Sequence, residues 1–166
     1  MSTSQNKWVQ EITNGLLLAL ITIVFTLLYT AFTFGTAAIV VFWIVKLLST
    51  LGTLYYFMSS HGEIGDSYTY RIAFKYGFMI SFYSAIFIAL YEYMHYTVLF
   101  PDLESSKIFV ESFQKRSQSI DQLTVERVTD KMPIIISICV LIYYSILGLI
   151  FSSIMASYIK RQKLLM

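Results

Sequence analysis

The chain has 166 residues, of which 57% are hydrophobic and 13% are charged, and its mean hydropathy is +0.65. Soluble domains are about 45–50% apolar, so this composition excludes an ordinary soluble domain and predicts a single membrane domain. The net charge is +2, and the basic residues are scattered apart from a C-terminal group, which gives nucleic-acid binding no electrostatic support. Cys139 is the only cysteine, so we expect an inert packing residue rather than a disulfide or a thiolate metal site.

The first half of the chain predicts two antiparallel spans, residues 12–32 and 37–58. The first apolar run meets the ~20 residues needed to cross ~30 Å of hydrocarbon and is too long for the core of a secretory signal. One of its faces is small and weakly polar and should look into the bundle: Gly15, Ala19, Thr22, Thr26, Thr30 and Thr33. Lys46 is nearly central in the second span, where a charge costs ~2.5–3.5 kcal/mol. We expect it to point into the bundle, although its stem is long enough to snorkel outward.

The third predicted span, residues 76–99, is the stretch around which the rest is organised. It follows residues 59–75, whose glycine and polar content predicts a loop. Small residues recur at every fourth position and form a shallow groove that another helix can approach closely: Gly77, Ser81, Ala85 and Ala89. Glu92 comes three residues after Ala89, which places its carboxylate on the same packed face and not toward lipid.

The last part of the chain predicts an extramembrane helical segment, residues 101–131, and a fourth span, residues 133–159. The segment should form one or two short amphipathic helices with an apolar stripe: Phe109, Phe113, Ile120 and Leu123. Pro133 is expected as the first residue of the last span. A second stripe of small residues should pack against the third span: Ser145, Gly148, Ser152 and Ala156. The sequence therefore predicts an all-α membrane protein, a four-transmembrane-helix bundle with a helical extramembrane segment between helices 3 and 4.

The basic residues near the predicted span ends favour cytoplasmic N- and C-termini. The side that holds both termini and the middle loop collects six: Lys7, Arg71, Lys75, Lys160, Arg161 and Lys163. The opposite side collects five: Lys107, Lys115, Arg116, Arg127 and Lys131. The three that directly follow the last span decide the orientation. We expect a multi-pass protein of the bacterial inner membrane.

Two stretches resemble a known family. Residues 62–78, GEIGDSYTYRIAFKYGF, and residues 91–104, YEYMHYTVLFPDLE, are similar to the small four-span membrane proteins grouped as domain of unknown function 4199, typical of Bacteroidetes. Residues 71–75 and 100–102 hold the matching positions, whereas the Ser-Tyr-Thr-Tyr stretch of residues 67–70 and Lys46 depart from the family pattern. The resemblance implies the four-span topology and no established activity.

A buried Lys46–Glu92 pair is the specific site hypothesis. At 1.5 Å per residue, Lys46 lies ~14 Å and Glu92 ~10 Å from the outer ends of their spans, so the two depths match. Tyr143 or Tyr144 of the last span is expected to add a hydrogen bond. The pair either only sets the register of the helices or provides a protonatable carboxylate in a transport path.

Glu92 and His95 also have the Glu-x-x-His spacing of di-metal four-helix bundles. A complete site needs a second such motif, which a symmetric dimer could supply. One chain contains only His61 and His95 as histidines, so neither a metal site within one chain nor a cofactor is expected. No nucleophile triad or phosphate-binding glycine loop is present in the sequence.

The favoured functional expectation is a non-enzymatic membrane subunit or scaffold. It would sit in the lipid bilayer and associate with itself or with another envelope protein through the stripe on residues 101–131. The alternative is a small transporter or flippase for a lipid-linked or amphipathic solute, which would use the intramembrane carboxylate of Glu92.

Overall fold

The computed structural model describes residues 2–32, 36–62, 69–99 and 122–164. These residues form the helices α1 (Ser2–Ala31), α2 (Thr36–Gly62), α3 (Tyr70–Met94) and α5 (Gln122–Leu164), and a π-helical turn, η1 (His95–Leu99), extends α3. Four stretches are long and apolar enough to cross a membrane: Lys7–Ala31, Ala37–His61, Tyr70–Val98 and Lys131–Ile159. No strand occurs in the described ranges. The predicted all-α, four-helix membrane architecture is confirmed.

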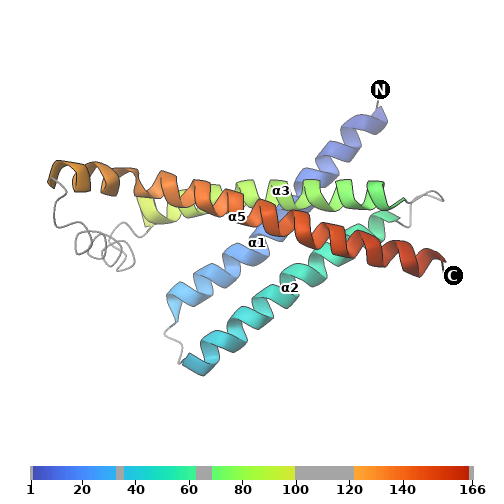
Figure 1. Ribbon diagram of the computed structural model, residues 1–166, viewed down its shortest axis with the longest axis horizontal. Helices are drawn as coiled ribbons and strands as arrows, with labels where there is room; N and C mark the ends of the chain where they lie inside the picture. Colours follow the sequence, from blue (N-terminus) through green and yellow to red (C-terminus); the bar gives the residue numbers. More distant parts are fainter. Residues whose placement is uncertain (1, 33–35, 63–68, 100–121, 165–166) are drawn as a thin grey trace.

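Helix α3 is the centre of the bundle. It packs most extensively against α5 and next most against α1, whereas α2 makes fewer contacts with its neighbours. In Figure 1, α3 and α5 run side by side along the long axis, α1 and α2 cross them obliquely, and both chain termini lie toward the same end. The buried residues of α3 extend from Ala73 through Ile80 to Ala89. These residues are spaced so that they form one stripe along the helix.

The crossing of α1 over α3 depends on Gly15. A methyl group at this position would lie 2.7 Å from Tyr83 Cβ and 3.0 Å from the carbonyl oxygen of Ile80. Both are closer than a carbon atom can approach without displacing its neighbour. Only glycine therefore lets the two backbones meet at this point, and the two helices diverge on either side of it.

The small-residue stripes of α3 and α5 face each other in antiparallel register. Gly148 lies against the side chain of Ser81, and a methyl group on Gly77 would lie 3.0 Å from Ser152 Oγ. The other members of the two stripes are buried or half-buried: Ala85, Ala89, Ala156 and Ser145. Small residues allow the close backbone approach that stabilises helix pairs in lipid.

Several helices are longer than the predicted spans. Helix α1 begins at Ser2, and helical residues at the end of α2 and the start of α3 occupy much of the range 59–75 that we predicted as loop. The prediction that Pro133 starts the last helix is wrong, because α5 begins at Gln122 and passes through it. Polar residues end an apolar run without ending a helix, and proline removes only one backbone donor.

The extramembrane segment is described only in part. Residues 122–131 are the first turns of α5 and continue directly into the last span. Phe109, Phe113 and Ile120 lie outside the described residues, and of Leu123 only the helical backbone is described. The docking role predicted for this stripe stays a prediction.

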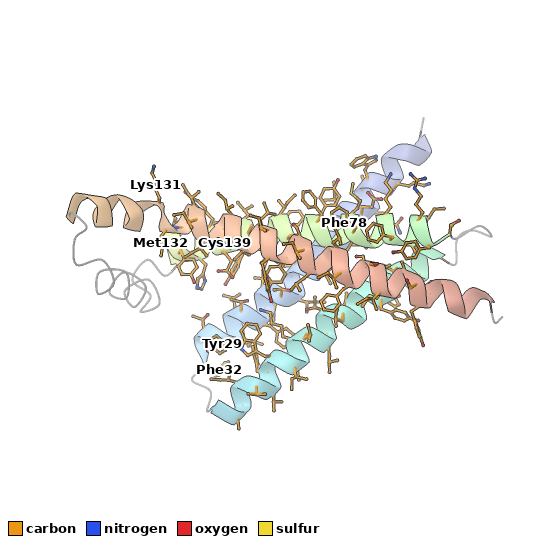
Figure 2. All side chains as sticks on the ribbon, viewed as in Figure 1. Tyr29, Phe32, Phe78, Lys131, Met132 and Cys139 are labelled. Atoms are coloured by element: carbon orange, nitrogen blue, oxygen red, sulfur yellow. The ribbon has the colours of Figure 1, made fainter. Side chains whose placement is uncertain are left out.

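The outer surfaces of the helices are apolar, as contact with lipid requires. Figure 2 shows side chains projecting outward along the membrane-spanning stretches of the helices, with Cys139 of α5 and Phe78 of α3 among those labelled. Cys139 is exposed on α5, so it does not pack in the interior of the bundle, and its inertness stays a prediction. An apolar run of sequence identifies a span but not which side of it faces its neighbours.

Candidate functional site

A groove of about 710 Å³ lies between α2 and the α3–α5 pair, and α1 also contributes to its wall. Most of its lining is apolar, with Ile44, Leu147 and Phe151 as examples. The lining residues Val40 and Trp43 of α2 are also exposed at the protein surface, so the groove is open on the side that faces lipid. Pockets of about 300–1,000 Å³ are typical of small-molecule sites.

Lys46 is the only charged residue among those that line the groove. Its Nζ donates a hydrogen bond to Thr26 Oγ1 at 3.3 Å and lies 5.0 Å from the centre of the Trp43 ring, within the range of a cation–π interaction. The Thr26 hydroxyl donates in turn to the carbonyl oxygen of Thr22 at 3.0 Å, which leaves its lone pairs for Lys46. An ammonium group has three N–H donors. Among the described residues, only Thr26 accepts a hydrogen bond from that of Lys46.

Glu92 is half-buried on α3 and attracts Lys46 electrostatically. The two described side chains form no direct ion pair, and Lys46 is hydrogen-bonded to Thr26 instead. Glu92 lies beyond the residues that line the groove. The attraction between the two charges therefore acts over a distance and leaves the Lys46 ammonium open to a closer partner.

Two tyrosines of α5, Tyr143 and Tyr144, also line the groove. Tyr143 is exposed, Tyr144 is half-buried, and their rings meet edge to face with centroids 5.3 Å apart. Tyr144 also interacts electrostatically with Glu92. The predicted hydrogen bond from either tyrosine to the charged pair does not form among the described side chains. Lys46 instead donates to Thr26, which we predicted on the inward face of the first span but not as a partner of Lys46.

His95 lies outside the groove. It is buried at the start of η1, and a hydrogen bond of 3.2 Å joins its Nδ1 to the Tyr91 hydroxyl. Its ring also meets Tyr96 edge to face. Within the described part of the chain, no three His, Cys, Asp or Glu side chains gather as ligands for a metal ion.

Two buried hydroxyls in the groove wall have no hydrogen-bond partner among the described groups. They are Thr22 Oγ1 and Ser81 Oγ, and the two residues are only 2% and 6% exposed. Thr26 and Thr50 donate to the carbonyl four residues earlier, the usual solution for a hydroxyl within a helix. An unpaired buried hydroxyl costs ~1–3 kcal/mol. These two oxygens are buried beneath the surface of the groove, so a bound molecule reaches one of them only after a change of side-chain rotamer.

A second polar cluster, which we did not predict, joins α1, α2 and α3 nearer the N-terminus. Asn14 Nδ2 donates to the Tyr76 hydroxyl at 2.8 Å, and the Tyr76 ring stacks on His61 with centroids 3.7 Å apart. Glu11 lies within electrostatic reach of Tyr76 and Lys75. The available signal was the i,i+3 spacing of Glu11 and Asn14 on one helix face. This cluster links α1, α2 and α3 through residues that do not line the groove.

Four apolar helices around a seam of small residues define a multi-pass integral membrane protein. The chain belongs to the family described as protein of unknown function (DUF4199), whose family model matches residues 13–161. The predicted membership of that family is confirmed. No curated protein and no solved structure matches the chain significantly.

Proposed function

We propose that this protein is a non-enzymatic membrane carrier that binds an amphipathic, lipid-like molecule in the groove between α2 and α5. This is the transporter or flippase alternative of the sequence analysis. The single observation that carries it is a groove of about 710 Å³ within the membrane-spanning helices, apolar except for one cation and a few hydroxyls. On the basic residues that follow the last span, we place the protein in the bacterial inner membrane with cytoplasmic termini.

The shape and chemistry of the groove favour a molecule with a hydrocarbon chain. The apolar lining of α2 and α5 suits such a chain, and exposure of Val40 and Trp43 lets it arrive sideways from the bilayer. The Lys46 ammonium in the groove wall suits a polar end. A site of mainly apolar walls with a few placed polar groups is typical of small-molecule binding.

The scaffold hypothesis rests on the apolar stripe within residues 101–131, which is known from the sequence alone. It remains a prediction with its own test: deletion of residues 103–131 should abolish association with a partner. The groove favours the carrier hypothesis, because a docking scaffold does not require a cavity with a cation in its wall.

Native tryptophan fluorescence provides a direct test. The chain has two tryptophans, Trp8 and Trp43, which are 53% and 54% exposed, but only Trp43 lines the groove. Trp8→Phe leaves Trp43 as the reporter, and Trp43→Phe leaves Trp8 as the matched control. We expect an amphiphile with a brominated chain, added to protein in vesicles of unbrominated lipid, to quench Trp43 saturably at a low mole fraction. Trp8 should be quenched only in proportion to the amphiphile dissolved in the bilayer.

Two neighbouring leucines supply a control for the groove itself. Leu47 lines the groove and Leu48 does not. Both side chains are exposed at the protein surface, by 48% and 63%, so they form a matched pair. Leu47→Phe should fill part of the cavity and weaken saturable quenching of Trp43 several-fold, whereas Leu48→Phe should leave it unchanged. Identical, unsaturable quenching of both tryptophans would refute the proposed function.

A further inference from the structure

We infer that the polar end of the bound molecule is an anion, a carboxylate or a phosphate. This anion binds the Lys46 ammonium and replaces Glu92 as its nearest negative charge. This inference rests on the proposed function and specifies the chemical class of its ligand. The groove, one charged side chain and two unpaired hydroxyls from three different helices carry it.

The charge of the groove selects the sign of the ligand. Lys46 is the only charged residue among those that line it, and a hydrogen bond to Thr26 occupies one of its donors. A cationic head would be repelled at short range, and a neutral head would leave the ammonium without a close counter-charge in an apolar site. An anion would accept the remaining N–H donors in charge-assisted hydrogen bonds, which are about twice as strong as neutral ones.

The unpaired hydroxyls add donors of the right kind. Thr22 on α1 and Ser81 on α3 are both more than nine-tenths buried, and their oxygens have no described partner. Both residues line the same groove as Lys46. A carboxylate or a phosphate accepts several hydrogen bonds, so one anionic head can engage the ammonium and, after a change of side-chain rotamer, a hydroxyl that is buried in the free protein.

Glu92 acts as the internal competitor. It attracts Lys46 without forming an ion pair with it, so a ligand anion that reaches the ammonium directly interacts more strongly than Glu92 does. Glu92 also repels an anion in the groove. Removal of its charge should therefore tighten binding, which is the opposite of what a merely structural partner of Lys46 would do.

The experiment compares head groups on one brominated chain in the Trp8→Phe protein, with quenching of Trp43 as the measurement. The probes end in a carboxylate, a phosphate monoester or a neutral alcohol. We expect the two anionic probes, or one of them, to bind about tenfold more tightly than the alcohol or better. If only one anion binds, that result supports the inference and identifies the source as a fatty carboxylate or a phosphate-headed lipid.

Three variants test the assigned residues. Lys46→Gln should remove the preference for anions, Lys46→Arg should keep it, and Glu92→Gln should tighten binding of the anionic probe by about threefold or more. Equal binding of alcohol and anion, an unchanged preference in Lys46→Gln, or weaker anion binding in Glu92→Gln would overturn the inference while leaving the carrier proposal intact. Absence of saturable quenching with every head group would instead overturn the proposed function. Thermal unfolding of each variant without amphiphile separates loss of binding from loss of folding.

Discussion

Replacement of Gly148 by alanine should loosen the contact between α3 and α5, whereas the same replacement at Gly52 should not. A methyl group on Gly148 would overlap Ser81 Cβ and lie 3.7 Å from Ser81 Cα, while a methyl group on Gly52 would meet nothing within 4 Å. The position of Ser81 Cβ is set by the backbone, so no rotamer change can relieve the overlap. The two helices must move apart along the seam.

The expected cost follows from two opposing contributions. Overpacking of a closely fitted interface costs ~1–3 kcal/mol, and alanine is favoured over glycine within a helix by up to ~1 kcal/mol. The second contribution is the same in both variants. The difference in unfolding free energy between Gly148→Ala and Gly52→Ala therefore isolates the steric cost, which we expect at ~1–3 kcal/mol.

Reversible unfolding in mixed detergent micelles measures this difference. A second variant, Ser81→Gly, removes the atom that Gly148→Ala would strike, so the double variant should recover much of the loss, with a coupling energy of ~0.5–3 kcal/mol. Equal stability of Gly148→Ala and Gly52→Ala, or strictly additive effects of Ser81→Gly and Gly148→Ala, would refute the close approach of the helices at this point.

Three further substitutions test other parts of the bundle by the same unfolding measurement. Tyr76→Phe removes the 2.8 Å hydrogen bond from Asn14 and should cost ~0.5–1.5 kcal/mol; an unchanged free energy would show that this bond does not stabilise the fold. Thr22→Val removes an unpaired buried hydroxyl and should stabilise the ligand-free protein by about 1 kcal/mol, while weakening binding of the anionic probe; a loss of stability would contradict the absence of a partner. Pro133→Ala restores a donor inside α5 and should raise stability by up to ~3 kcal/mol; an unchanged value would be expected only if the helix began there.

The number of spans and the pairing of α3 with α5 follow from local sequence patterns. Apolar runs of sufficient length identify spans because the bilayer sets a minimum length. Small residues at every fourth position mark a face that another helix can approach, and the structure places Gly77 and Ser81 against Ser152 and Gly148. Helix ends were less predictable, since polar residues near a span can still continue its backbone hydrogen bonding, as they do before Pro133.

The groove could not be predicted from the same patterns, because a crossing angle is not a local property. The contact of Gly15 with Ile80 and Tyr83 sets where α1 meets α3, and α2 packs against α1. The matching depths of Lys46 and Glu92 in the membrane predict a direct pair between them. The oblique course of α1 and α2 (Figure 1) instead brings Lys46 to Thr26 and leaves Glu92 at a distance.

The packing also indicates which part of the bundle can respond to a ligand. Helices α3 and α5 are joined by the tight Gly148–Ser81 contact and the most extensive interface in the protein, whereas α2 has only sparse contacts with α3 and α5. Because a sparse interface reorganises at lower cost than a closely packed one, we expect α2 to move, whereas α1, which crosses α3 closely at Gly15, should stay fixed with α3 and α5. Lys46 lies on the mobile side and Glu92 on the fixed side. An anion that replaces Glu92 as the nearest negative charge to Lys46 would therefore change the attraction between α2 and the rest of the bundle. Ligand binding would in this way alter the width of the groove.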